Sequence, residues 1–456
     1  MTKKIPFLPA LLGLVCTAAV MFLCLVVLQT SPQLPLLVGC VIASVIALLY
    51  RHPLKDICGG MIQGIRQSLE AIVILLLIGV LIGVWIAAGV VPAMVYYGLK
   101  LISPRFFLAS AMLVCAVISM ALGSWGTAGT VGLAFMGIAQ AMGIPLPLTA
   151  GAVISGSYVG DKLSPMADST NLASAVAEVN IFDNIRNIFK VALPMLLLCL
   201  GVYTAIGWRY GDAAAADSLS NIAQFSDTLS QTFHLNVFTF FPLLILLGCI
   251  LVKIPAIPSI SVAIVTGGVY GTCVQHAPFK TILTCAYSGY VGNTDFDMVN
   301  DLLTAGGLSS MFYSVSIVIL AMAFGGVMER TGQMEVLVSP IIEKVHGFVG
   351  LMAATVLTCV GVNIVLPDQY IAIALPGRMY AAAYDKRGMS RKDLALGIGV
   401  GGALTSALVP WNTCGVFMSG VLGVKTAAYL PFTFYNIGML FAAVIYAAIR
   451  QKHNKQ

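Results

Sequence analysis

The chain alternates long apolar runs with short polar connections, and most of the runs approach the roughly 20 residues that a membrane-spanning helix needs. Such runs should be helical, because lipid offers backbone groups no hydrogen-bond partners and a helix satisfies them internally. The predicted spans lie near residues 6–28, 34–50, 68–92, 106–123, 191–208, 236–252, 257–274, 312–328 and 348–366. This pattern predicts an all-α polytopic membrane protein with about 11–13 membrane segments, including broken helices and re-entrant hairpins.

Composition supports this class. The 456 residues are 59% hydrophobic and 9% charged, against about 25% charged in soluble domains. The N-terminal apolar run is longer than the core of a signal peptide and reads as a retained first span. The net charge of +6 resides in loops, so it indicates orientation and not nucleic-acid binding. Basic loops at residues 51–55 and 386–392 then place the N-terminus of this multi-pass membrane protein in the cytoplasm.

Residues 155–174 cannot form an ordinary membrane helix. Pro165 removes an amide donor and clashes with the preceding turn, so the helix should break there. Broken backbone is tolerated in a bilayer only where it is buried in protein or lines a water-filled cavity. The oxygen-bearing side chains around the break are typical of a site for a hard cation: Asp161, Asp168, Ser169, Thr170 and Asn171. The alternative interpretation is a polar loop at the membrane surface.

A second segment of the same kind surrounds Pro410, which is followed by Asn412 and Thr413. Each half has a glycine-bearing span, a further span, an interrupted segment and then a proline-broken polar helix. This order predicts two inverted-topology repeats, with chance similarity between apolar sequences as the alternative. The expected organisation is N-terminal spans at 1–65, repeat 1 at 66–208, an external loop with linking spans at 209–311, repeat 2 at 312–449 and a cytoplasmic tail at 450–456.

At these motifs the sequence resembles the NhaC-type sodium/proton antiporter family, and the likeness covers most of the chain. The motifs that carry it are Gly160-Asp161-Lys162-Leu163-Ser164-Pro165, Asp168-Ser169-Thr170-Asn171-Leu172-Ala173, Asp368-Gln369-Tyr370, Leu375-Pro376-Gly377-Arg378-Met379 and Pro410-Trp411-Asn412-Thr413-Cys414-Gly415. The resemblance implies a protein of the bacterial inner membrane that exports sodium in exchange for protons. In some relatives it implies sodium- and proton-coupled exchange of small organic acids such as malate and lactate. In the family an acidic pair often precedes Pro-Trp-Asn, whereas this chain has Gly399-Val400-Gly401-Gly402 there.

A buried carboxylate can serve both ions, because desolvation raises its pKa while a bound cation lowers it. Protonation and sodium binding then exclude each other, and exchange follows. Our hypothesis assigns this role to Asp168, with Asp161 or Asp368 second. Neutral ligands would be Ser169, Thr170, Asn171, Asn412 and Thr413, with sodium held at Asp168, Ser169, Thr170 and Asn171. The alternative role for Asp161 is a structural ion pair with Arg378 or Lys162.

A second hypothesis keeps the sodium site but makes an organic acid or amino acid the cargo, with Arg378, Ser124 and Thr127 as its contacts. Arg378 has an alternative role as a snorkelling or paired arginine. An enzyme is not expected, because the sequence contains no HExxH, GxSxG or Walker A motif. The expected partners are membrane lipid, Na+, H+ and, under the second hypothesis, the organic solute, with no cofactor and no nucleic acid. The oligomeric state, with a homodimer as one option, stays open.

Overall fold

The computed structural model describes residues 4–28, 30–213, 217–252, 254–337 and 347–453. The described residues are mostly helical and contain no strand, only one isolated bridge between Tyr290 and Ala305. Turns and irregular segments connect the helices. Seven of the described helices are long and apolar enough to cross a membrane, or up to nine if each bent pair counts as one span. The predicted all-α polytopic class is confirmed. The predicted total of 11–13 is larger because it also counts shorter and interrupted segments.

Three short apolar helices supplement the long ones: α1 (Phe7–Phe22), α2 (Gln33–Leu49) and α5 (Val90–Leu101). The rest of the first half consists of α3 (Leu54–Gln67), α4 (Leu69–Ala87), α6 (Phe107–Thr127), α7 (Leu133–Ala141), α8 (Leu146–Leu163), α9 (Asp168–Val176) and α10 (Ile181–Ala213). The middle consists of α11 (Asp217–Thr232), α12 (Phe241–Leu251), α13 (Ala256–Cys273), α14 (Phe279–Ser288) and α15 (Asp297–Leu303). The last part holds α16 (Phe312–Arg330), α18 (Gly347–Val365), α19 (Gln369–Lys386), α20 (Arg391–Ile398), α21 (Thr413–Leu422), α22 (Thr426–Tyr429) and α23 (Phe434–His453).

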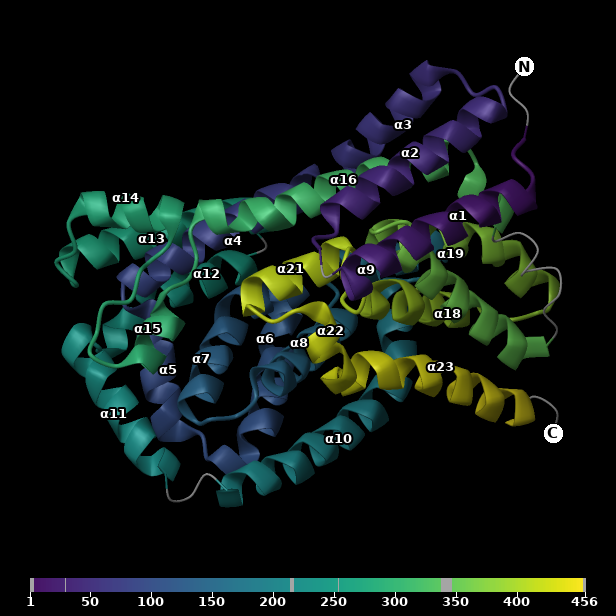
Figure 1. The fold of residues 1–456 in the computed structure, drawn as a ribbon. Coiled ribbons are helices and arrows are strands. Elements are labelled where there is room, and N and C mark those ends of the chain that lie inside the picture. The colour runs from purple at the N-terminus through teal and green to yellow at the C-terminus, as the bar shows by residue number, and fades with distance from the viewer. Residues whose placement is uncertain (1–3, 29, 214–216, 253, 338–346, 454–456) are drawn as a thin grey trace.

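Helices α6 and α8 pack together near the middle of the molecule (Figure 1). Every residue of α8 from 148 to 162 is buried, although this helix carries an aspartate and a lysine at its C-terminal end. A helix that is buried all round belongs to the interior of a large protein. The polar end of α8 therefore faces other protein groups and the cavity described below, and lipid does not reach it.

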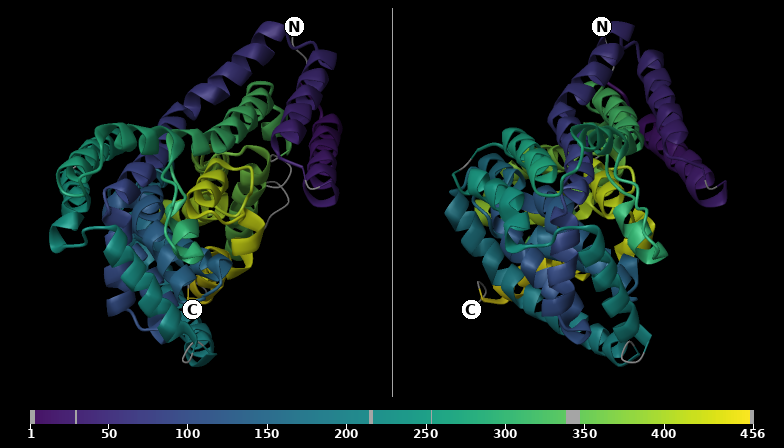
Figure 2. Two further views of the ribbon diagram at one scale, coloured as in Figure 1. Left: turned by 60° about the vertical axis from the view of Figure 1, so that its left-hand side comes forward. Right: turned by 90° about the vertical axis from the view of Figure 1, so that its left-hand side faces the viewer.

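The N-terminal helices α1, α2 and α3 form an arm at the edge of the molecule, with α16 beside it (Figures 1 and 2). Helices α3 and α16 approach closely through glycines. A Cβ atom added to Gly64 would lie 2.1 Å from the backbone oxygen of Met322, and one added to Gly326 would lie 2.1 Å from that of Gly60. Small residues of this kind allow membrane helices to pack backbone against backbone.

Both predicted proline breaks are present. Helix α8 ends at Leu163 and α9 begins at Asp168, so Pro165 lies in the gap between them. Pro410 lies in the turn that precedes α21. A third break occurs inside α6 at Gly123, whose φ of 67° and ψ of 176° are far from helical. Because this combination is essentially restricted to glycine, the sequence places the break at that residue.

Three predicted boundaries differ from the structure. The span at 68–92 consists of two helices, because Gly89 adopts φ 77° and ends α4. The span predicted at 191–208 is part of a longer helix, α10, which begins at Ile181 and continues through Pro194. The segment 209–235, expected to be an external loop, is largely helical where it is described. Its helix α11 buries an apolar stripe with Phe225 and Leu229 at helical spacing.

Candidate functional site

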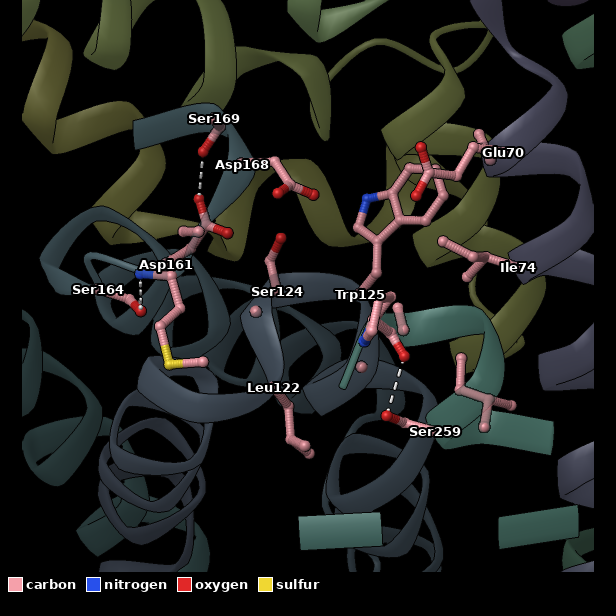
Figure 3. A pocket seen from close by; sticks show the side chains of 18 of the residues that line it. Glu70, Ile74, Leu122, Ser124, Trp125, Asp161, Ser164, Asp168, Ser169 and Ser259 are labelled. Carbon is pink, nitrogen blue, oxygen red and sulfur yellow. Dashed lines mark hydrogen bonds between the residues drawn. The ribbon is translucent and has the colours of Figure 1, made fainter. Parts of the chain in front are cut away.

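A cavity of about 490 Å³ lies where the broken helices of both halves meet (Figure 3). Its wall includes the start of α4, the residues around the break in α6, the α8–α9 break and the first residues of α19 and α21. Four acidic residues line it: Glu70, Asp161, Asp168 and Asp368. Among the described residues of the wall there is no lysine, arginine or histidine. The cavity is therefore an acidic chamber inside an apolar protein.

Asp161 is neutralised by an internal cation. Lys162, with 1% of its surface exposed, places its Nζ 3.1 Å from Asp161 Oδ2. Ser169 Oγ also donates to Asp161 Oδ2 at 2.6 Å, across the α8–α9 break. A buried charge is tolerated when it is both paired and hydrogen-bonded. The sequence offered an ion pair with Lys162 as one role for Asp161, and this ion pair is present. The hydrogen bond from Ser169 links the two helices across the break.

The remaining contacts at this break hold the backbone in place. Ser164 Oγ donates to the backbone oxygen of Met120 at 2.6 Å. Thr170 Oγ1 donates to the backbone oxygen of Asp161 at 3.0 Å. Asn171 Nδ2 donates to the backbone oxygens of Pro165 and Ala167 at 3.0 and 3.1 Å. The freed carbonyls of the broken helix are thus satisfied largely by side chains, as a break at membrane depth requires.

Asp168 differs from Asp161 in its contacts. It is the first residue of α9, a position where a negative charge interacts favourably with the helix dipole. Its carboxylate makes no hydrogen bond or ion pair with any described residue and is accessible from the cavity. Figure 3 shows the Ser124 hydroxyl directed towards it. That hydroxyl also has no partner among the described residues, although Ser124 is only 6% exposed.

The second half contributes Asp368 and Thr413 to the wall. Asp368 is the N-cap of α19, and its Oδ1 accepts from the backbone N–H groups of Tyr370 and Ile371 at 2.8 and 3.1 Å. The backbone N–H of Thr413 donates to the oxygen of Pro367 at 2.9 Å. The break before α19 and the break before α21 are thereby tied together. Ser169 and Asp168 face these residues across the same cavity.

The structure brings together six of the residues that the sequence singled out: Asp161, Asp168, Asp368, Ser169, Thr413 and Ser124 line the cavity. Thr170, Asn171, Asn412, Thr127 and Arg378 do not line it. Asn412 instead caps α21 and donates to Asn363 Oδ1 at 2.9 Å. Thr127 Oγ1 donates to the oxygen of Gly123, within its own helix, at 2.9 Å. Arg378 is exposed on α19, and its Nε donates to the oxygen of Ala374 at 3.3 Å.

Glu70 and Trp125 also belong to the wall, although neither is among the site residues predicted from the sequence. Glu70 reaches the cavity from the start of α4. In the sequence, a single carboxylate at the start of an otherwise apolar helix was the feature that could have indicated this position. Trp125 follows the break at Gly123 and stacks on Phe417 of α21, with ring centroids 4.3 Å apart. This stack joins the two halves at the cavity, and only the folded chain brings the two rings together.

The described residues contain no group of three or more histidine, cysteine, aspartate and glutamate side chains that could hold a metal ion. The donors around Asp168 are instead one carboxylate, hydroxyls and backbone oxygens. Hard monovalent and divalent cations prefer such oxygen ligands, whereas zinc and other transition metals prefer imidazole and thiolate. The chemistry of the wall therefore fits a transported ion better than a resident metal centre.

The profile of the Na+/H+ antiporter family matches residues 156–449. The match begins inside α8 and covers both proline breaks and the Asp368 motif. The chain belongs to the Na+/H+ antiporter family. The family that the sequence motifs resemble is thereby confirmed, and with it the class of multi-pass membrane transporter.

Three curated relatives show how this family varies. A malate-2H+/Na+-lactate antiporter of Bacillus subtilis is 34% identical over 445 residues, which is 96% of this chain and 94% of the relative. The Na+/H+ antiporter NhaC of the same organism is 35% identical over 437 residues, with 95% and 96% covered. The arginine/ornithine antiporter ArcD of Halobacterium salinarum is 33% identical over 437 residues, with 95% and 90% covered. These relatives are nearly equally similar to this chain, but their names refer to different transported solutes.

Proposed function

We propose that this chain exchanges Na+ for H+ at Asp168. The observation that carries the proposal is the difference between the two neighbouring carboxylates. Asp161 already has a cation, Lys162, at 3.1 Å, whereas the carboxylate of Asp168 has no partner among the described residues. An anionic group that faces a cavity without a counter-charge is available to a transported cation or a proton.

Sodium would bind between the Asp168 carboxylate and the Ser124 hydroxyl. Thr413, which also lines the cavity, would offer a further neutral oxygen from the second half. Ser169 is already engaged as a donor to Asp161, so its oxygen supports the site indirectly. Asp168, Ser124 and Thr413 would then be the sodium ligands. Thr170, Asn171 and Asn412 would instead stabilise the broken helices through their hydrogen bonds.

Exchange follows from competition at one carboxylate. A proton and a sodium ion neutralise the same charge, so the occupied site carries one or the other. The neutralised site can pass through the membrane interior at lower cost than a bare carboxylate. Because the wall is made of broken helices from both halves, a movement of one half against the other would expose the site alternately to the two sides.

The test uses purified protein in liposomes that contain a pH-sensitive dye. Adding Na+ outside should move protons outward through the native protein, whereas K+ should not. Asp168→Asn should abolish the response, and Asp227→Asn, a change at an exposed position on α11, should leave it intact. Sodium-driven proton movement that survives in Asp168→Asn would refute the proposed site.

A second candidate function is exchange of an organic solute together with Na+ or H+. Two observations favour it: the cavity has the volume of a small-molecule site, and two relatives are named for organic cargoes. The same liposomes decide between the two candidate functions when malate, lactate or arginine is offered with and without Na+.

We also infer a cytoplasmic N-terminus from the basic loop that follows α2. Labelling of single cysteines from either side of the membrane would test it.

A further inference from the structure

We propose that the cavity binds a small organic cation with two ammonium groups, one at Asp168 and the other at Glu70. This inference rests on the proposed function in using Asp168 as the cation-binding carboxylate. It adds a second anchor, Glu70, and names the class of solute. Four features of the cavity support it: its size, the charges of its wall, an aromatic ring in the wall and a buried hydroxyl without a partner among the described residues.

The volume exceeds what an inorganic ion needs. The cavity measures about 490 Å³, within the range of about 300–1,000 Å³ that is typical of sites for organic ligands. Sodium coordination needs only oxygens about 2.3–2.6 Å from the ion if its site resembles those of other hard cations. The Asp168 end alone suffices for that, so the chamber extending towards Glu70 has room for a longer solute.

The charges of the wall select the sign of this solute. Glu70 and Asp168 are both unpaired among the described residues, and Asp368 adds a third carboxylate that is bound to backbone N–H groups. The described residues that line the cavity include no lysine, arginine or histidine. Lys162 is paired with Asp161, and Arg378 does not line the cavity. A dicarboxylate placed here would face like charges without a counter-ion. An organic cation would instead relieve the repulsion between the carboxylates.

Trp125 lines the cavity together with both anchors. Figure 3 shows its indole on the side of Asp168 on which Glu70 also lies. One face of the ring stacks on Phe417, with the ring centroids 4.3 Å apart. The residue is partly exposed and lines the cavity. An aromatic face attracts ammonium groups and pairs well with an alkyl chain, which matches the middle of a linear diamine.

The unpartnered hydroxyl of Ser124 is an independent sign of a ligand. This residue is more than nine-tenths buried, yet its hydroxyl points towards Asp168 in the cavity and bonds to no described residue. Buried hydroxyls normally find a partner. An ammonium group held at Asp168 supplies N–H donors for which the Ser124 oxygen is a suitable acceptor.

The experiment measures binding by calorimetry to the full-length protein in detergent, with 1,4-diaminobutane as the probe. The matched probes are 1,4-butanediol, which has the same length without charge, and succinate, which carries the opposite charge. We expect the diamine to bind, sodium to compete with it, and neither matched probe to bind. Proton movement on addition of the diamine is then measured in proteoliposomes, with protein-free liposomes correcting for passive leak of the uncharged amine.

Two variants locate the ligand. Glu70→Gln removes one charged anchor and should weaken diamine binding by about tenfold to a hundredfold, and by more than it weakens sodium binding. Trp125→Leu should weaken it by about twofold to thirtyfold. Asp227→Asn, an exposed acidic position on α11, is the matched control and should bind as the native protein does. Size-exclusion profiles and thermal melts establish that each variant is folded.

The outcomes separate this inference from the proposed function. Sodium-driven proton movement without diamine binding would overturn the inference and leave the antiporter proposal standing. Diamine binding without sodium-driven proton movement would support the inference and remove the proposal. Diamine binding that is unchanged in both Glu70→Gln and Trp125→Leu, or binding of succinate in its place, would show that the cavity does not recognise an organic cation.

Discussion

Lys162 Nζ lies 3.1 Å from Asp161 Oδ2, inside a helix whose last turns are fully buried. The pair divides the carboxylates of the cavity into two kinds. Asp161 holds a permanent internal cation and a hydroxyl from α9, so it fastens the α8–α9 break. Asp168, on the other side of that break, has no cation and no hydroxyl bound to it among the described residues. The division predicts that substitution of the two aspartates will affect different properties, stability for one and transport for the other.

Removing the ammonium group should destabilise the fold. Lys162→Met leaves the Asp161 carboxylate buried without its counter-charge, which typically costs about 3–5 kcal/mol. Thermal unfolding in detergent should therefore occur at a clearly lower temperature. The double variant Asp161→Leu with Lys162→Met removes both charges and should recover much of the loss, because an apolar pair of similar volume often replaces a buried ion pair without cost. If the double variant were no more stable than Lys162→Met, the unpaired charge of Asp161 would not be the cause of the lower unfolding temperature.

Asp168→Asn should remove sodium-driven exchange while leaving stability almost unchanged, because the carboxylate has no partner among the described residues to lose. A thermal melt within a few degrees of the native one, together with no proton movement on addition of Na+, is the expected pair of results. If instead the variant melted far lower than the native protein, Asp168 would have a structural role that its free carboxylate does not indicate.

The apparent affinity for sodium should fall as the pH falls. Protons and sodium compete for Asp168, so below the pKa of this carboxylate each pH unit should weaken sodium binding about tenfold. The charged and titratable groups that face Asp168 are Glu70 from α4, Asp161 with Lys162 from α8, and Asp368 with Tyr370 from α19. Sodium activation curves between pH 4 and pH 9 would measure the effect. A half-saturating sodium concentration that stays constant over this range would contradict competition.

The contact between α3 and α16 should be sensitive to a single methyl-sized addition. Gly64→Ala places a Cβ 2.1 Å from the backbone oxygen of Met322, so the helices must move apart. Overpacking of this kind costs about 1–3 kcal/mol. Gly59→Ala on the same helix is the control, since nothing lies within 4 Å of the added Cβ, and alanine favours a helix. We expect a lower melting temperature for the first variant and an equal or higher one for the second.

Gly123→Ala should impair transport by straining the break in α6. The φ of 67° and ψ of 176° at this residue are disfavoured for any side chain, and the strain amounts to about 1–3 kcal/mol. Relief of that strain would shift the next two residues, Ser124 and Trp125, in the wall of the cavity. Gly201→Ala, at a helical glycine with free space around it, is the comparison. Equal initial rates of sodium-driven proton movement in the two variants would show that the break tolerates a side chain.

The lengths of the apolar runs decide the class of this protein, because lipid forces almost any such run into a helix. The positions of Pro165 and Pro410 likewise decide where two helices break, since proline lacks the donor that an unbroken helix needs. Family membership also follows from the sequence, because its motifs lie at these same breaks. These features depend on local chemistry, so they can be read from residues that are close together along the chain.

The composition of the cavity depends on contacts between distant segments. Glu70 and Asp168 belong to different helices, and only the packing of α4 against the rest of the bundle brings both to one wall. The sequence placed Asn171 and Asp168 in the same motif, but α9 turns one towards the backbone of the break and the other into the cavity. Side-chain direction on a short helix is set by how that helix docks. The sequence therefore determines that a polar break exists, and the tertiary structure determines which of its residues are free to bind an ion.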